Sequence, residues 1–215
     1  MVIDLSKNNS LLNHWVAELR DVHVQNDRMR FRRNIERIGE VAAYEISKTF
    51  SFIPIKIQTP LEQTSGYELK NQPVIATILR AGLPLFQGLI NYLDKADSSF
   101  VAAYRKHDEK GFHIEQSYVT APNLEGRPLI IADPMLATGA SFIKAIPSLL
   151  SNGTPSEIHI VCVIASQEGI DFVQNALPNA HIWVGAIDPR LNDKSYILPG
   201  LGDAGDLCFG EKLQN

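Results

Sequence analysis

The sequence predicts an α/β fold in which helices flank a central, mostly parallel sheet. Two observations carry this prediction. Short apolar runs typical of buried strands alternate along the chain with segments of roughly ten residues that have a helical pattern. In addition, the runs are almost continuously apolar, which is typical of parallel strands covered by helices on both faces. We therefore expect βαβ units with ligand-binding loops at one edge of the sheet.

The chain is expected to begin with helices and then to alternate between strands and helices. Residues 1–50 are expected to form N-terminal helices, because apolar side chains in residues 26–50 recur close to every 3.6 residues. The expected buried strands cover residues 74–79, 99–104, 129–132, 157–165 and 181–187. The expected helices between them cover residues 83–93, 141–151 and 167–176.

Three segments do not fit the alternation. Residues 53–67 are expected to be extended or to form a hairpin. Residues 105–126 carry charge at both ends and strand-like spacing between, which indicates a protruding β-arm or lid within a single domain that covers residues 1–215. Residues 188–215 are rich in Gly, Pro and Asp and are expected to be loop, with a functional segment at 188–210.

Composition excludes several classes of protein. Of the 215 residues, 45% are hydrophobic, so a disordered chain is excluded. The net charge of −4 gives no reason to expect nucleic acid or an anionic membrane as a partner. The two cysteines match neither a disulfide framework nor a zinc site, and we find no secretory signal and no membrane-spanning run. These features favour a cytoplasmic protein in a reducing compartment.

The strongest motif covers residues 130–141, where an apolar strand leads into Asp133, a turn of small residues and a helix. Backbone amides at the start of that helix favour an anion, and Thr138 and Ser141 add hydroxyl groups. Asp133 can accept hydrogen bonds from sugar hydroxyls, so the segment suits a sugar phosphate. The alternative is an ordinary strand–turn–helix in which Ser141 caps the helix. The P-loop pattern is absent.

Two further segments indicate ligand contact. Residues 78–84 follow a strand and open a helix, so that Arg80 and the amides beside Gly82 suit a second anion site, unless Arg80 only caps the strand end. Residues 196–206 contain a formal Gly-x-Gly-x-x-Gly pattern, but too few residues come after it for a dinucleotide-binding unit. The glycines let the backbone approach a planar ligand closely. The alternative is a glycine-rich surface loop.

Together, Asp-Pro-Met-Leu-Ala-Thr-Gly at residues 133–139 and Pro-Gly-Leu-Gly-Asp-Ala-Gly-Asp at 199–206 resemble the motifs of uracil phosphoribosyltransferases, which belong to the type I phosphoribosyltransferases. The resemblance covers nearly the whole chain and implies that fold, with a β-arm and a C-terminal base-binding loop or hood. It implies transfer of phosphoribose from 5-phosphoribosyl diphosphate (PRPP) to uracil, which yields UMP and diphosphate.

The resemblance also implies the site residues. Arg80, often on a cis peptide in this family, and Asp203 are the expected catalytic residues. The expected PRPP-binding residues are Arg80, Arg105, Asp133, Pro134, Met135, Leu136, Ala137, Thr138, Gly139, Ala140, Ser141 and Asp203. The expected uracil-binding residues are Ile197, Gly202, Asp203 and Ala204. The expected cofactor is Mg²⁺, held mainly by diphosphate and water, with no metal ligand from the protein.

Several expectations remain open at this stage. The family implies a homodimer or higher homo-oligomer, for which the β-arm and the Arg-rich helix are candidate interfaces, and GTP is a candidate effector. Ala140 departs from the family's usual second glycine and is neutral only if that position is helical. The alternatives for function are a PRPP- or UMP-sensing, RNA-binding regulator on the same fold, or the same reaction on xanthine or orotate. The absence of a cation between residues 197 and 209 argues against orotate.

Overall fold

The computed structural model describes residues 1–108 and 111–211, and the side chains of that part outside residues 103–117. In this part of the chain an eight-stranded sheet has the order β1-β10-β9-β7-β4-β5-β6, with β8 also paired to β9. All pairings are parallel except that of β5 with β6. The strands are β1 (Val2–Asp4), β4 (Val74–Leu79), β5 (Asp97–Asp108), β6 (Gly111–Thr120), β7 (Pro128–Ala132), β8 (Met135–Leu136), β9 (Glu157–Ser166) and β10 (His181–Asp188).

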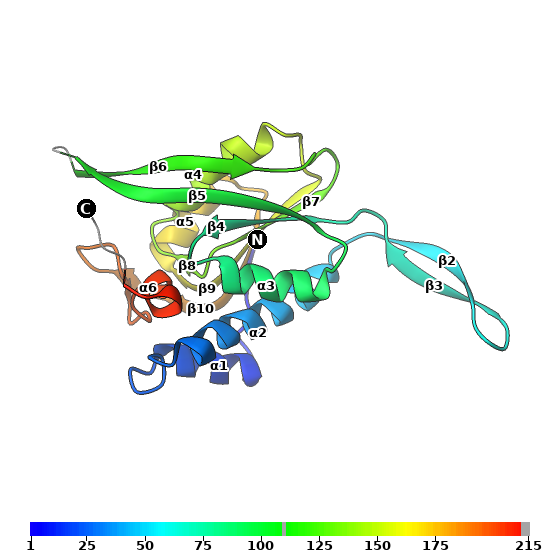
Figure 1. Cartoon of the computed structure of the whole chain (residues 1–215), viewed down its shortest axis with the longest axis horizontal. Coiled ribbons are helices and arrows are strands. Elements are labelled where there is room, and N and C mark those ends of the chain that lie inside the picture. Colours follow the sequence, from blue (N-terminus) through cyan, green and yellow to red (C-terminus); the bar gives the residue numbers. More distant parts are fainter. Residues whose placement is uncertain (109–110, 212–215) are drawn as a thin grey trace.

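Helices cover both faces of this sheet, as the continuously apolar strands predict. Helices α1, α2 and α3 gather on one side and α4 and α5 on the other (Figure 1). Their bounds are α1 (Leu11–Arg20), α2 (Arg28–Ser47), α3 (Leu83–Tyr92), α4 (Ala140–Leu150) and α5 (Gln167–Ala176). The neighbouring residues Ile130 and Ile131 of β7 are both fully buried but belong to opposite hydrophobic cores. The predicted fold class is therefore confirmed.

The N-terminal segment is not entirely helical, so that expectation was wrong for its first residues. Val2–Asp4 forms β1, which pairs in parallel with β10. A strand of three residues has no periodicity of its own, and it exists because β10 offers a free edge. The two helices after it begin at side-chain caps, because Ser10 accepts a hydrogen bond from Leu12 and Asp27 accepts one from Arg30.

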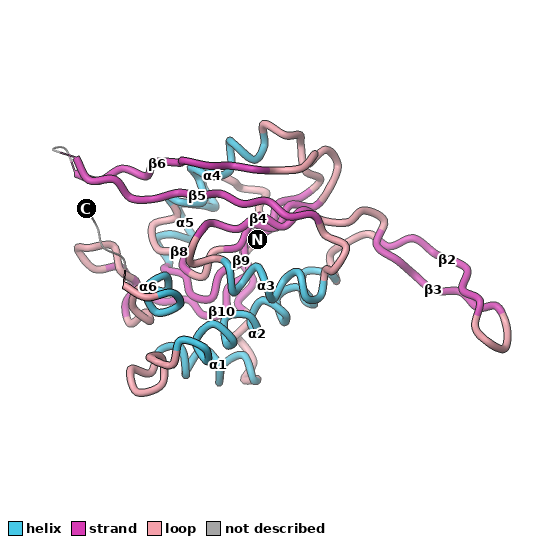
Figure 2. Tube along the Cα trace, viewed as in Figure 1, coloured by secondary structure: helices cyan, strands magenta, loops and turns pink. Residues whose placement is uncertain are grey.

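A hairpin that projects from the body is formed by β2 (Phe52–Gln58) and β3 (Gln63–Leu69), which pair antiparallel (Figure 2). This confirms the expected extended or hairpin structure. Residues 105–108 and 111–126 of the expected arm continue from the edge of the main sheet, as the far parts of β5 and β6 and the loop after β6, while residues 109–110 lie outside the described residues. In Figure 1 the far ends of β5 and β6 point away from the β2–β3 hairpin.

The C-terminal segment is more ordered than the loop that the sequence predicts. It contains the antiparallel pair β11 (Arg190–Leu191) and β12 (Ile197–Leu198), followed by α6 (Ala204–Phe209). These elements are two to six residues long, which is too short for a helical or strand period to be seen in the sequence. Contacts with the rest of the fold therefore decide their structure. Among the described residues, no helix is both long and apolar enough to cross a membrane.

Candidate functional site

The three predicted segments come after the carboxyl ends of β4, β7 and β10. Because these strands run parallel in one sheet, the loops after them meet at the same edge. The first loop turns directly after β4, where the peptide bond between Leu79 and Arg80 is cis. Pro84 then stands in the first turn of α3, a position where its missing N–H removes no helical hydrogen bond.

Hydrogen bonds to β9 fix the turn after β7. The carbonyl of Pro134 accepts hydrogen bonds from the amides of Val163 (3.0 Å) and Ile164 (3.1 Å). At the far side of the turn, Ser166 Oγ donates to the carbonyl of Ala137 at 2.6 Å. Ser166 is itself fully buried at the end of β9, so it anchors the turn rather than a ligand. Ser166 was not among the predicted site residues.

Helix α4 begins at Ala140, with Gly139 as its N-cap in a left-handed conformation (φ +77°). Ser141 is therefore inside the helix, which corrects the alternative that it caps the helix. Gly139 offers no side-chain cap, and the hydroxyl of Thr138 accepts from the Ala140 amide at 3.3 Å. The other amides of this first turn point off a helix N-terminus, which is a suitable place for a phosphate group.

Two aspartates influence each other across the site. The pKa of Asp133 is raised from 3.8 to about 7. Burial is the main cause; the Met135 amide, which donates to Asp133 Oδ1 at 3.2 Å, lowers the pKa, and the negative charge of Asp203 also raises it. The interaction brings the end of β7 and the C-terminal segment into one electrostatic environment. A pair of carboxylates in such a place favours a ligand that brings hydroxyl donors or positive charge.

The C-terminal segment also packs directly on the turn after β4. Arg80 donates to Asp206 Oδ1 at 2.8 Å and to the carbonyl of Gly210 at 3.0 Å. A Cβ placed on Gly205 would lie 3.8 Å from Cβ of Ala81 and 3.9 Å from Nε of Arg80. Asp203 caps α6 by accepting from the Asp206 amide at 3.0 Å. Arg80 and Asp203, the two expected catalytic residues, therefore lie on loops that touch.

The expected uracil-binding residues differ in their exposure to solvent. The side chains of Ile197 and Ala204 are buried (3% and 2% exposed), whereas Gly202 is exposed. The side chains of Ile197 and Ala204 belong to the hydrophobic core, so the only polar groups that these two residues can offer a ligand are those of the backbone. Arg105 lies in β5, but its side chain is outside the described part of the structure.

Two residues that the sequence analysis missed fix the C-terminal segment. Arg20 at the end of α1 forms a two-pronged ion pair with Asp188 at the end of β10, with N···O distances of 2.7 and 2.8 Å. Both residues also bond to the backbone of Gly200. An acidic residue directly after a buried strand was the signal that identified Asp133, and it could have identified Asp188. No local signal marks Arg20.

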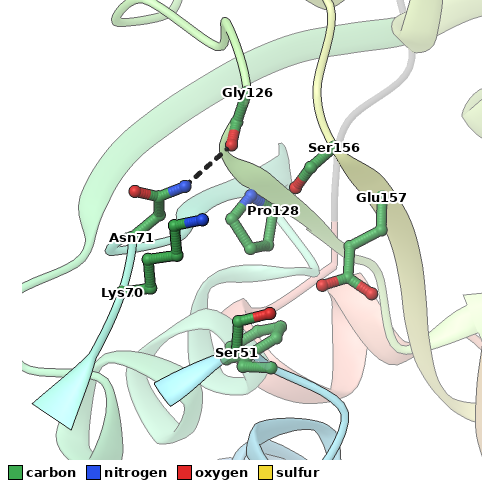
Figure 3. Close-up of a pocket in the computed structure, with 8 residues that line it drawn as sticks. Ser51, Lys70, Asn71, Gly126, Pro128, Ser156 and Glu157 are labelled. Atoms are coloured by element: carbon green, nitrogen blue, oxygen red, sulfur yellow. Dashed lines mark hydrogen bonds between the residues drawn. The ribbon is translucent and has the colours of Figure 1, made fainter. Parts of the chain in front are cut away.

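A separate pocket of about 250 Å³ lies at the other edge of the sheet (Figure 3). It includes Pro128 and Glu157, the first residues of β7 and β9, so it opens at the amino ends of the parallel strands. Asn71 bridges it by donating to the Gly126 carbonyl at 3.1 Å. Its lining residues are Phe50, Ser51, Lys70, Asn71, Gly126, Pro128, Ser156 and Glu157. None of the predicted site residues contributes to it.

Comparison with known structures agrees with this architecture. The protein AQ2163 from Aquifex aeolicus superposes with a TM-score of 0.88 at 29% identity, over 100% of both chains. A hypoxanthine phosphoribosyltransferase from Staphylococcus aureus shares the fold at 14% identity, with a TM-score of 0.50 over 86% of this chain and 84% of that one.

Comparison of sequences is more specific. Proteins named uracil phosphoribosyltransferase are 51% identical in Porphyromonas gingivalis, over 99% of both chains, and 42% identical in Methanococcus vannielii, over 94% of this chain and 88% of that one. A third, from Pyrococcus furiosus, is 40% identical over 93% and 86%. The family model described as uracil phosphoribosyltransferase matches residues 6–211, a span that includes all three loops of the site. The chain therefore belongs to the uracil phosphoribosyltransferase family.

Proposed function

We propose that the protein transfers phosphoribose from PRPP to N1 of uracil, which yields UMP and diphosphate. The observation that carries this proposal is the contact between the turn after β4 and the C-terminal segment, made by Arg80 with Asp206 and Gly210. It joins the segment expected to bind diphosphate to the segment expected to bind the base. A transferase needs both substrates side by side, because proximity and orientation supply much of its rate.

The donor fits the loops after β4 and β7. The 5′-phosphate would bind the amides at the start of α4, together with the hydroxyls of Thr138 and Ser141. Asp133 stands at the start of the same turn, where its carboxylate can accept hydrogen bonds from the ribose hydroxyls. Arg80 would leave Asp206 to bind the diphosphate, with Arg105 as its expected second cation.

The base fits the C-terminal segment. Uracil presents a carbonyl, an N–H and a second carbonyl in one plane, and the backbone of Ile197 and residues 202–204 can match that edge. Cytosine presents a different pattern of donors and acceptors, so a buried backbone group would lose its partner at a cost of about 1–3 kcal/mol. The side chains of Ile197 and Ala204 pack in the hydrophobic core, where they support the backbone proposed to contact the base.

In this proposal Mg²⁺ binds to the substrate, whose diphosphate oxygens are its ligands. Among the described residues, no group of three or more His, Cys, Asp or Glu is arranged to hold a metal ion. The site does hold the carboxylates of Asp133 and Asp203, which favour a donor whose negative charge is partly neutralised by a cation over the bare anion. Mg²⁺ bound to diphosphate oxygens and water would neutralise part of the leaving group's charge.

The protein's own tasks are positioning and charge stabilisation. The bond between the anomeric carbon and diphosphate breaks, the bond to N1 of uracil forms, and N1 loses its proton. Positive charge that develops on the ribose ring is stabilised by the carboxylate of Asp133. Asp203 orients the donor or takes part in removal of the N1 proton, and Arg80 stabilises the departing diphosphate. In this proposal the β-arm at residues 106–118 would close over the site and limit hydrolysis of the donor.

The comparisons favour the enzyme over an RNA-binding regulator, because the family model and the three relatives named above all carry the enzyme's name. We further propose a homodimer or higher homo-oligomer whose contact includes the β2–β3 hairpin, where Leu61 and Tyr67 are 94% and 76% exposed. Cytoplasmic location is part of the proposal and agrees with two cysteines that are free and buried.

The decisive experiment measures UMP formed from uracil and PRPP with Mg²⁺. Cytosine, orotate and xanthine are tested in parallel, each with and without GTP. Turnover with uracil alone supports the proposed reaction and the role of the C-terminal segment. Turnover with another base reassigns the acceptor. Binding of PRPP or UMP by calorimetry without any turnover would indicate a sensor instead, and GTP dependence would identify an effector.

A further inference from the structure

The two residues that the sequence analysis missed form a closed ring with the backbone of Gly200. Arg20 Nη1 donates to Asp188 Oδ2 at 2.8 Å and to the Gly200 carbonyl at 3.0 Å. The Gly200 amide donates to the same Asp188 Oδ2 at 3.0 Å. Arg20 Nη2 completes the ion pair by donating to Asp188 Oδ1 at 2.7 Å. One ion pair thus binds both backbone groups of a single residue.

This ring joins three parts of the chain that are distant in sequence: the last residue of α1, the last residue of β10 and the segment before α6. Asp188 is 4% exposed, and its carboxylate has three hydrogen bonds from this ring. Removal of any partner would leave a buried charged or polar group without compensation. The ring therefore holds Gly200 in one place.

The position of Gly200 matters because it leads into the base-binding residues. Gly200 adopts a left-handed conformation (φ +64°), and a Cβ there would overlap the carbonyl of Ile197. Leu201 is buried next to it, and Gly202 and Asp203 come directly after. Fixing Gly200 thus fixes the origin of residues 202–204, whose backbone we propose contacts uracil.

We propose that Arg20 and Asp188 are positioning residues that set the enzyme's affinity for uracil by fixing Gly200. Neither side chain needs to touch a substrate. This inference rests on the proposed function, because it assigns the ring to the base-binding half of the same site. It predicts that weakening the ring impairs use of uracil more than use of PRPP, since the turn after β7 is held separately by β9 and Ser166.

The chain offers a matched control for this test. Arg127 has a side-chain exposure of 22%, against 23% for Arg20, and pairs with Asp97 at 2.7 Å. Like Arg20, it also donates to backbone carbonyls, those of Gln72 (2.9 Å) and Pro73 (3.1 Å). These contacts lie near the amino ends of β4 and β5, at the edge opposite the site. Arg127→Lys therefore repeats the chemical change of Arg20→Lys away from the base-binding segment.

Steady-state kinetics with both substrates provide the first readout. Arg20→Lys keeps the charge but loses the two-pronged geometry. We expect it to raise KM for uracil by about tenfold and KM for PRPP by a clearly smaller factor, because Asp203 alone of the expected PRPP-binding residues lies in the segment that the ring holds. Asp188→Asn, which keeps the size of the side chain, should act in the same direction. Arg127→Lys should change neither KM. Equal rises in both constants, or an unchanged KM for uracil, would overturn the proposal.

Amide hydrogen exchange provides a second readout that does not require activity. Residues 197–203 should exchange faster in Arg20→Lys and Asp188→Asn than in the wild type and in Arg127→Lys, under native conditions. Equal protection in all four proteins would show that the ring does not hold the segment. If the wild type makes no UMP, the proposed function fails on that result alone, while the exchange data still decide whether the ring fixes Gly200.

Discussion

Arg80 donates to Asp206 Oδ1 at 2.8 Å, although the two residues are 126 positions apart in the sequence. Arg80 follows the strand β4, and Asp206 lies in the first turn of α6. The guanidinium that is expected to bind diphosphate is thus paired with a carboxylate of the base-binding segment. Diphosphate would replace Asp206 as the partner of Arg80, so donor binding and the position of α6 are linked.

Replacement of Arg80 tests this role. We expect Arg80→Ala to lower kcat/KM for PRPP by about 100-fold or more, because one charged donor to the leaving group is lost, while KM for uracil changes much less. Arg33→Ala is the matched control, since the two arginines have similar exposure (41% and 43%) and each pairs with a carboxylate. Kinetics close to wild type in Arg80→Ala would remove Arg80 from the site.

The raised pKa of Asp133 makes stability depend on pH. The pKa is 3.8 in an unfolded chain and about 7 in the folded protein. The folded state therefore binds the proton more tightly, and the stability that this contributes is complete below pH 3.8 and is lost as the pH rises through about 7. We expect the free energy of unfolding of the wild type to fall over this range relative to that of Asp133→Asn, measured by urea titration at several pH values.

Asp203→Asn gives a sharper form of the same test. Burial is the main cause of the raised pKa, and the charge of Asp203 adds to it. An asparagine at position 203 removes that charge but can still cap α6. The pKa of Asp133 in the folded protein should then be lower, so the loss of stability should be smaller and should be complete at a lower pH than in the wild type. A pH dependence identical in all three proteins would show that Asp133 does not titrate in this range.

The sequence predicted the parts of the molecule whose patterns are local. The strand at residues 74–79 and the helix at 167–176 were placed with their observed bounds, because a continuous apolar run and a clear helical period identify them. The loops after β4 and β7 and the C-terminal segment were identified because each has a distinctive local composition. The parallel sheet then placed these loops at one edge.

What the sequence could not predict depends on contacts between distant segments. The strand β1 forms only because β10 leaves an edge open. Arg80 and Asp206 are 126 positions apart in the sequence. In the ring, Arg20 is more than 100 positions from both Asp188 and Gly200, and only Asp188 and Gly200 are near each other in the sequence. No local pattern encodes such a contact, because each partner alone is an ordinary charged residue.

Substitutions at the adjacent residues Gly139 and Ala140 are expected to differ in the size of their effects on stability and activity. Ala140 is the first helical residue of α4, so Ala140→Gly should cost at most about 1 kcal/mol of stability and leave kcat/KM nearly unchanged. Gly139 has φ +77°, and a Cβ there would lie 2.7 Å from Cγ2 of Val173. Gly139→Ala should therefore distort the turn and lower both the melting temperature and kcat/KM for PRPP.

Thermal melts and steady-state kinetics on Ala140→Gly and Gly139→Ala test both predictions. If Ala140→Gly raised kcat/KM severalfold, the alanine would be a functional impairment relative to the family's usual glycine, and the helical assignment of position 140 would not explain it. If Gly139→Ala matched the wild type in both measurements, the left-handed conformation at position 139 would be unnecessary for the turn.

The β2–β3 hairpin predicts how the protein assembles. Alternate residues of a strand share one face, so Ile53, Ile55 and Ile57 line the same face of β2. Ile53 and Ile57 are each 39% exposed, and Gly66 on β3 leaves room for Ile57 to lie across the pair. A two-stranded hairpin that projects from the body has little stability of its own, and an apolar face of this kind gains stability when a second copy covers it.

We therefore expect the double variant with Ile53→Ser and Ile57→Ser to shift the protein from dimer, or higher oligomer, to monomer in light scattering at micromolar concentration. The helices and the sheet lie outside the hairpin, so the circular dichroism spectrum should stay close to that of the wild type. Val22→Ser is the control, because Val22 is 63% exposed but lies in the turn between α1 and α2. Assembly that survives the double variant while Val22→Ser disrupts it would move the interface from the hairpin to the N-terminal helices, where the Arg-rich α2 provides the alternative surface.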